Sequence, residues 1–157
     1  MTTMRTQRHG GFLVAKIHQL GGRIFARLLK QRGIDELNPA QGRIMFVLWQ
    51  EDGIPFTALA RRTQLDKSTL TSMVDRLERA GLVQRIPSKE DRRQIILRRT
   101  QKDRRLESLY VAVSREMNEI FYKGFPTPDI ARFESDLARI LHNLEEYEAV
   151  VTRPGTA

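Results

Sequence analysis

Short hydroxyl side chains gather beside a lysine in one stretch of the sequence, Asp66-Lys67-Ser68-Thr69-Leu70-Thr71-Ser72. Serine and threonine hydroxyls form hydrogen bonds with nucleic-acid bases or phosphates, and their small size lets the backbone approach closely. The predicted polyanion contacts are therefore Lys67, Ser68, Thr69, Thr71 and Ser72, with Arg76 on the exposed side of the same predicted helix as a phosphate contact. The alternative is an ordinary helix N-terminus, where serine and threonine are common.

A second charged cluster, Lys89-Glu90-Asp91-Arg92-Arg93, lies between two short apolar stretches. An arginine at the tip of a β-hairpin can enter the narrow, electronegative minor groove of DNA. We expect Asp91 to pair with Arg93 across the turn and to fix the direction of that side chain, because a carboxylate near phosphate needs a structural role. The candidate contacts in this cluster are Lys89, Asp91, Arg92 and Arg93, and the alternative is a solvated charged turn.

The excess positive charge of the 157-residue chain lies in one segment. The chain holds 27 Lys and Arg against 19 Asp and Glu, a net charge of +8. Residues 61–105 contain fourteen basic and six acidic residues, while the rest of the chain contains thirteen of each. Such a concentration is typical of a polyanion-binding surface, although a solvated basic face remains the alternative. An anionic membrane fits less well, because no long basic amphipathic helix with bulky apolar residues is present.

Several classes of protein are excluded by missing residues and patterns. The sequence has no cysteine, which excludes disulfide frameworks and thiolate metal sites. His9, His18 and His142 are not at metal-ligand spacing, and neither a glycine-rich phosphate loop nor paired carboxylates suited to acid–base catalysis occur. We therefore expect no enzyme activity, no cofactor and no metal. The polar start of the chain is not a signal peptide and no apolar run could span a membrane, so we expect a soluble, cytoplasmic protein.

Helix signals define the elements that must position these clusters. Apolar residues recur at helical spacing from Phe12 to Leu29, and Gly33 is a suitable stop. The next predicted helix begins with a capping box at Asn38 and Gln41, with Pro39 at its first position. A short helix over 55–63 and a tight link at 64–65 lead to a helix that Asp66 caps and Gly81 ends.

The remaining elements are a hairpin and two further helices. Stretches 82–86 and 93–97 are rich in β-branched residues and flank a polar turn, which predicts a β-hairpin with a long charged tip. Thr100 with Asp103 predicts a second capping box, and Gly124 ends the helix that it starts. Thr127 caps the last predicted helix, with Pro128 at its first position. Residues 152–157 are expected to be disordered.

Wide apolar stripes on the first and the last two predicted helices indicate a dimer. The short helix, the tight turn, the second helix and the hairpin together predict a winged helix-turn-helix lobe. A winged lobe of about 65 residues is too small to cover all three stripes, whereas packing against a second copy buries them. A monomeric helical bundle is the alternative.

The pattern as a whole resembles the MarR-type transcriptional regulators. The resemblance rests on the segments Leu59-Ala60, Asp66 to Thr71, Val74 to Glu78, Gly81 to Arg85, and Asp91 to Arg93. It implies a homodimer whose terminal helices interlock and whose two winged lobes bind a palindrome, with Asp91 and Arg93 in the wing roles given above. It also implies a pocket for a small effector, often an anionic aromatic compound, for which the candidate lining residues are His18, Phe46 and Trp49.

One departure from the family pattern follows the wing. Family members usually have Leu-Thr-x-x-Gly there, whereas this chain has Arg99-Thr100-Gln101-Lys102-Asp103. The threonine cap is retained, but the leucine and glycine positions carry Arg99 and Asp103. This predicts added charge near the lobe that faces DNA.

These inferences predict a mainly α-helical fold with a small β-hairpin wing, in which a winged helix-turn-helix lobe is joined to a helical dimerisation region from both termini. The expected parts are a dimerisation helix over 1–37, the DNA-binding lobe over 38–100, dimerisation helices over 101–151 and the tail over 152–157. The predicted function is a regulator that binds a pseudo-palindromic operator in double-stranded DNA as a homodimer, as a repressor that a small effector releases. The alternative is a winged-helix module whose basic face binds an acidic protein.

Overall fold

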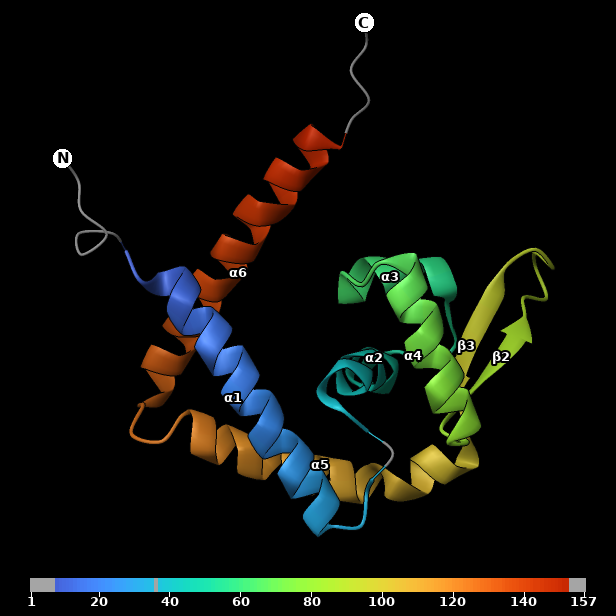
Figure 1. Ribbon diagram of the computed structural model, residues 1–157, viewed down its shortest axis with the longest axis horizontal. Helices are drawn as coiled ribbons and strands as arrows, with labels where there is room; N and C mark the ends of the chain where they lie inside the picture. Colours follow the sequence, from blue (N-terminus) through green and yellow to red (C-terminus); the bar gives the residue numbers. More distant parts are fainter. Residues whose placement is uncertain (1–7, 36, 153–157) are drawn as a thin grey trace, which may run out of the picture. The chain divides into compact units, whose positions relative to one another are not determined.

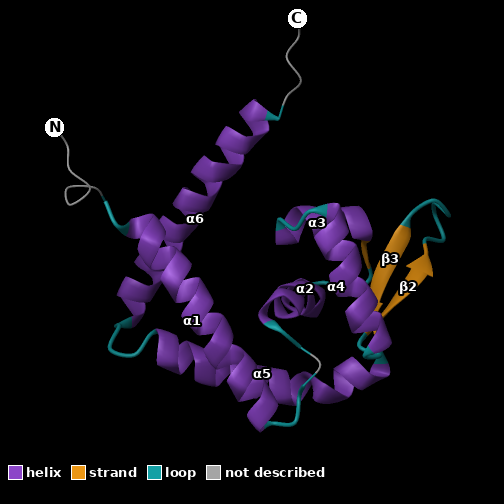
Figure 2. Cartoon of the chain, viewed as in Figure 1, coloured by secondary structure: helices purple, strands orange, loops and turns teal. Residues whose placement is uncertain are grey.

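The computed structural model describes residues 8–35 and 37–152, which form six helices and a three-stranded sheet (Figures 1 and 2). By contacts between Cα atoms the chain divides into two units, one ending at Met117 and the other beginning at Asn118. The elements are, in chain order, α1 (Gly10–Gln31), α2 (Pro39–Gln50), β1 (Ile54–Pro55), α3 (Phe56–Thr63), α4 (Lys67–Arg79), β2 (Val83–Pro87), β3 (Ile95–Arg99), α5 (Gln101–Phe121) and α6 (Thr127–Val151). The predicted fold class and element order are confirmed.

Local caps define the helices of the predicted DNA-binding lobe, as the sequence predicts. Asn38 and Gln41 form a reciprocal capping box, each side chain accepting a backbone N–H of the other at 2.8 Å. The Asp66 side chain caps α4, and Gly81 adopts a φ of +74° just beyond its end. Because glycine has no Cβ, it takes up this left-handed conformation without strain and turns the chain into β2.

The sheet contains one strand more than the predicted hairpin. Its order is β1-β3-β2, with both pairs antiparallel, and β2 and β3 pair from Val83 opposite Arg99 to Pro87 opposite Ile95. The predicted strands are thus one or two residues too early. The additional strand, β1, has only two residues, so it is too short for an alternating pattern to reveal it.

A single apolar core holds α2, α3, α4 and the sheet together. Its largest fully buried side chains come from α1, the loop after it, α2, α3, α4, the turn after α4, β2 and β3: Leu29, Ile34, Ile44, Met45, Leu48, Leu59, Leu70, Val74, Leu77, Leu82, Val83 and Leu97. Leu70, Val74 and Leu77 lie on the inner face of α4, so the opposite face of that helix is presented to solvent. Within the described ranges, no helix is both long enough and apolar enough to cross a lipid bilayer.

The second unit is a helical hairpin with no fully buried residue on α6. Gly124, at φ +85°, turns the chain between the helices, and Tyr122 makes edge-on contacts with Phe121, Phe125 and Phe133. The Tyr122 hydroxyl donates to the Glu134 carboxylate at 2.7 Å, and this hydrogen bond raises the pKa of Tyr122. The predicted Thr127 cap is wrong: the helix begins at Thr127 and Pro126 is the N-cap, which has no side-chain donor or acceptor.

Two other boundary predictions differ from the structure. The Thr100–Asp103 capping box is only half formed, because the Thr100 hydroxyl accepts from the Asp103 backbone at 3.2 Å while the Asp103 carboxylate binds an arginine instead. Thr152 of the tail is the C-cap of α6, and residues 153–157 lie outside the described residues.

Candidate nucleic-acid interface

The N-terminus of α4 is organised around the Asp66 carboxylate. Asp66 accepts from the Thr69 backbone N–H at 2.8 Å, the Thr69 hydroxyl at 2.6 Å and the Ser68 hydroxyl at 2.7 Å. These bonds, with that from the Thr69 hydroxyl the largest contribution, hold the pKa of Asp66 well below its ordinary value. The carboxylate therefore remains charged at any pH at which the protein is expected to work.

This cap occupies the hydroxyl hydrogens of several predicted contacts. Ser68 and Thr69 donate to Asp66, and the Thr71 hydroxyl donates to the Lys67 carbonyl at 2.7 Å. Their oxygens still have lone pairs that can accept from a base amino group. Ser72 is exposed and its hydroxyl forms no hydrogen bond within residues 8–35 and 37–152, so it is the hydroxyl best placed to donate to a partner.

The hairpin tip is held by backbone hydrogen bonds. The buried Ser88 hydroxyl accepts from the backbone N–H groups of Glu90 and Asp91 at 3.2 and 3.3 Å. The Asp91 carboxylate accepts from the Arg93 backbone N–H at 3.0 Å, and the Asp91 carbonyl accepts from the Gln94 N–H at 2.9 Å. The tip is therefore an ordered turn that presents its cations to solvent.

The prediction that Asp91 pairs with the Arg93 side chain needs a correction. Asp91 holds the backbone of Arg93, and no ion pair joins the two side chains in the described chain. A hydrogen bond between an aspartate carboxylate and the N–H two residues ahead closes a short local ring, which is favoured because it needs no rearrangement of the long arginine side chain. Asp91 consequently shapes the loop on which Arg93 stands.

A groove of about 350 Å³ brings the two predicted clusters together. Lys67 and Thr71 from α4 meet Arg93 from the hairpin there, and the remaining lining is Pro55, Phe56, Thr57, Arg85, Gln94 and Ile95. Figure 1 shows the hairpin and α4 side by side, and α4 contacts β2 directly. Residues about twenty positions apart in the sequence thus line one basic groove.

Arg85 is a groove residue that the sequence reasoning missed. It stands on β2 and binds two carboxylates of α4, Asp75 at 2.5 Å and Glu78. Partial burial acts to lower the pKa of Arg85, but the hydrogen bonds to Asp75 and Glu78 outweigh it and raise that pKa. The pattern Asp75-x-x-Glu78 on one helix face was the available signal, and it shows how the hairpin is fastened to α4.

Ion pairing leaves a specific set of cations available. Arg62 binds Glu51, Arg85 binds Asp75 and Glu78, and two more arginines pair near the start of α5. The cations on the outer face of α4 and at the hairpin tip are all exposed, and none forms an ion pair among the residues that the structure describes: Lys67, Arg76, Arg79, Lys89, Arg92 and Arg93. The positive charge is therefore concentrated on one face of the lobe.

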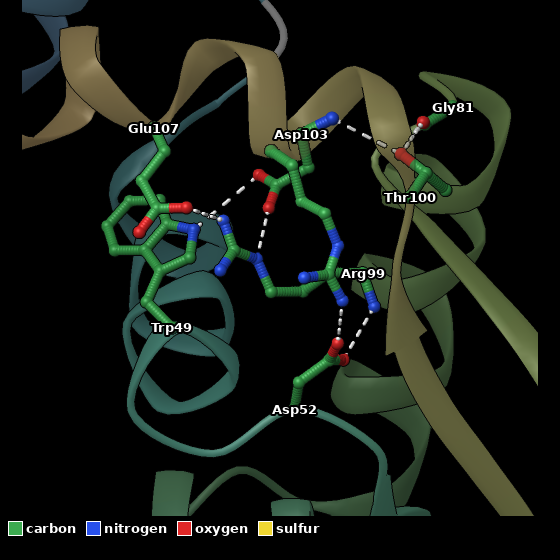
Figure 3. Close-up of polar contacts among 8 residues, drawn as sticks. Trp49, Asp52, Gly81, Arg99, Thr100, Asp103 and Glu107 are labelled. Carbon is green, nitrogen blue, oxygen red and sulfur yellow. Dashed lines mark hydrogen bonds and ion pairs between the residues drawn. The ribbon is translucent and has the colours of Figure 1, made fainter.

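The departures at Arg99 and Asp103 do not add charge to this face. Both side chains are buried, and they form an ion pair with each other at 2.5 Å (Figure 3). The prediction of added charge near DNA was wrong, because the fold turns both groups inward where they neutralise each other.

The three predicted effector residues lie in different surroundings. His18 is exposed on α1 and Phe46 is 55% exposed on α2. Trp49 is half-buried and stacks on Tyr110, with ring centroids 4.5 Å apart. None of the three lines the basic groove or a second groove of about 420 Å³ along the outer side of the hairpin.

Comparisons with known proteins agree with this geometry. The sequence model of the MarR family matches residues 37–95. TtmR of Methylorubrum extorquens, an HTH-type transcriptional regulator, is 36% identical over 86 residues, which cover 55% of this chain and 43% of TtmR. IacR of Pseudomonas putida, an HTH-type transcriptional repressor, is 26% identical over 134 residues, covering 85% of this chain and 78% of IacR.

A solved structure extends the likeness to the whole fold. The crystal structure of overoxidised AbfR bound to DNA superposes with a TM-score of 0.68 at 27% identity, covering 90% of this chain and 96% of AbfR. This chain spans less than half the length of TtmR but nearly all of AbfR, so the likeness includes the helices outside the lobe as well as the lobe itself.

Proposed function

Because the chain belongs to the MarR family of transcriptional regulators, which are not enzymes, we propose that it binds double-stranded DNA through α4 and the hairpin tip. In this arrangement the outer face of α4 enters the major groove and the tip reaches the adjacent minor groove. The contacts are Lys67, Ser68, Thr69, Thr71, Ser72 and Arg76 on and beside α4, and Lys89, Arg92 and Arg93 on the tip, with Asp91 shaping that tip.

The observation that carries this proposal is the unneutralised basic face. Six exposed cations lie on α4 and the tip without an ion pair in the described residues: Lys67, Arg76, Arg79, Lys89, Arg92 and Arg93. They outnumber the three carboxylates beside them that form no ion pair in those residues, Asp66, Glu90 and Asp91. Without a polyanionic partner the cations on this face repel one another, whereas the phosphates of DNA would balance their charge. The groove between α4 and the hairpin has the cations on its rim that a backbone phosphate requires.

The proposed assembly is a homodimer on a pseudo-palindromic operator. Large apolar side chains are exposed on α1 and again on α6, among them Phe12 at 64%, Leu144 at 62% and Tyr147 at 73%. A monomer rarely exposes so many, and a two-fold partner would bury them. Two lobes related by that axis would contact half-sites about one DNA turn, roughly 34–36 Å, apart.

The regulatory proposal is repression in the cytoplasm, where the operator DNA lies. It is supported by the likeness to IacR, whose name describes a repressor. The resemblance to the family further suggests release by a small anionic aromatic effector, with His18, Phe46 and Trp49 as the residues to test first.

The experiment is a comparison of two charge-removal variants on duplex DNA. Fragments of the source genome that the protein retains supply the operator, and binding is titrated at several salt concentrations. Lys67→Ala/Arg76→Ala removes four cations per dimer, so the log–log salt slope should fall by roughly 3 to 4. The matched control, Arg23→Ala/Arg27→Ala on exposed α1 positions, should leave the slope unchanged. Equal slopes for the two variants, or binding of an acidic protein but no duplex, would overturn the proposal.

A further inference from the structure

We propose that Arg99 and Asp103 are positioning residues, whose buried ion pair fixes the DNA-binding lobe on α5 and thereby sets the half-site spacing that the protein accepts. This inference rests on the proposed function for its DNA-binding consequence, but its structural part is independent of DNA. It concerns residues up to Met117 only, all of which lie in the first unit.

The pair joins a strand to a helix. Arg99 is the last residue of β3 and Asp103 lies in the first turn of α5, and their side chains are 6% and 0% exposed. The Arg99 Nε donates to the Asp103 carboxylate at 2.5 Å, and another guanidinium nitrogen of Arg99 donates to Glu107 at 3.0 Å. Figure 3 shows the Arg99 guanidinium between these two carboxylates of α5. Arg99 therefore binds carboxylates on two successive turns of α5.

The end of α2 is bound to the same cluster. The Asp52 carboxylate accepts from the Arg99 backbone N–H at 2.8 Å and from Arg104 at 2.5 Å. The Trp49 indole N–H points at the second Asp103 oxygen, at 3.5 Å. The end of α2, β3 and the start of α5 are thus joined by one set of charged hydrogen bonds.

A neighbouring contact reinforces the junction from the other side. The Thr100 hydroxyl donates to the Gly81 carbonyl at 2.6 Å, and the Thr100 N–H donates to the Leu82 carbonyl. The start of α5 is therefore fastened both to the turn after α4 and to the end of β3.

A buried ion pair differs from an apolar contact in being directional. An apolar contact has similar energy over a range of sliding and rotation, whereas bonds from a planar guanidinium to two carboxylates require one orientation. Replacing such a pair by apolar residues often preserves stability, so we assign these charges a role in conformational specificity. Arg99 and Asp103 are the two positions at which this chain departs from the family pattern, and their side chains bind each other. The two departures therefore act as one unit.

The geometry indicates why a small change at this junction matters for DNA. Five strand residues at about 3.4 Å each give the hairpin a lever of roughly 17 Å. A rotation of about 5° at the start of α5 would move the tip by ~1.5 Å, nearly half of the ~3.4 Å rise of one base. A loosened junction should therefore tolerate half-sites that are one base pair too close or too far apart.

The test separates stability from positioning with four variants. Arg99→Leu leaves the buried Asp103 carboxylate without its ion-pair partner, and Asp103→Ala leaves the buried Arg99 with the exposed Glu107 alone, so each should lower the Tm. The double variant Arg99→Leu/Asp103→Ala removes both charges and should recover most of the Tm. Arg105→Leu, an exposed position on the same helix, is the matched control. Each protein is titrated with operators whose half-site spacing is changed by −1, 0 and +1 base pair.

We expect the double variant to fold and to bind the optimal operator within about threefold of the parent. Its preference for that operator over the two altered spacings should fall by at least threefold, and amide exchange in β3 and in the first turn of α5 should accelerate at least tenfold. Arg105→Leu should retain the spacing preference and the exchange rates of the parent. A double variant with the parent's spacing preference and exchange rates would overturn the inference.

Failure of the proposed function gives a different result. A parent protein that binds no duplex at all would overturn the proposed function and the spacing consequence together. The amide-exchange comparison needs no DNA, so in that case it still decides whether the ion pair holds the wing on α5. A parent that binds the operator, beside a double variant that matches it in every measurement, overturns only this inference.

Discussion

The variants Asp91→Asn and Asp91→Ala separate two effects of the Asp91 carboxylate on the hairpin tip, a hydrogen bond and a negative charge. The carboxylate accepts the Arg93 backbone N–H at 3.0 Å, and it also places a negative charge beside cations that we propose to face DNA. Asp91→Asn keeps an oxygen acceptor in the same position and removes only the charge. Asp91→Ala removes both the charge and the hydrogen bond.

The two effects have opposite signs and comparable sizes. A charge about 7 Å from a phosphate in water is repelled by ~0.6 kcal/mol, less at higher salt, so Asp91→Asn should tighten binding by roughly two- to threefold per wing. An intramolecular hydrogen bond contributes about 0.5–1.5 kcal/mol to the order of the turn. Asp91→Ala should therefore bind more weakly than Asp91→Asn, by about 1–3 kcal/mol for the two wings of a dimer.

Arg93→Ala supplies the reference for the same tip. Loss of one good base-level contact should weaken specific binding by roughly 1–3 kcal/mol per wing. The log–log salt slope should fall by about 0.9 per wing, or ~1.8 for a dimer. The assay is a titration of one labelled operator with all three variants at two salt concentrations, with sedimentation to show that the oligomeric state is unchanged. Equal affinities for Asp91→Asn and Asp91→Ala would refute the role of Asp91 in ordering the turn.

Three further predictions concern the cap, the assembly and oxidation. Hydrogen bonds from Thr69 lower the pKa of Asp66 below its ordinary 3.8, so the cap should stabilise the protein at neutral pH and lose this effect only as the pH falls below 3.8. Asp66→Ala should therefore have a lower Tm than the parent between pH 7 and pH 5. A Tm difference between the two proteins that stays constant down to pH 2 would contradict this. Removal of residues 129–157 should abolish the dimer and operator binding together, and a truncated protein that still sediments as a dimer would contradict the proposed interface. Peroxide should not release the operator in a manner that dithiothreitol reverses, since the sequence has no thiol to oxidise, and a reversible release would disprove this.

The sequence by itself determined the features that depend on near neighbours. The Asn38–Gln41 capping box, the Asp66 cap and the Gly81 turn each involve residues within a few positions of one another. Their energetics are set by local backbone geometry, which the chain carries wherever it is placed. Helical periodicity likewise placed Leu70, Val74 and Leu77 in the core and left the hydroxyl-bearing face of α4 outside.

The tertiary structure alone decided which charged groups meet and which remain exposed. A charge pattern does not say that Arg85 reaches Asp75 and Glu78, nor that Asp91 binds a backbone N–H in preference to a guanidinium. Arg99 and Asp103 look like surface charges in the sequence, and only the fold buries them together. The physical reason is that the free energy of a charge depends on its burial and on partners brought from distant positions, whereas the caps depend on neighbours along the chain.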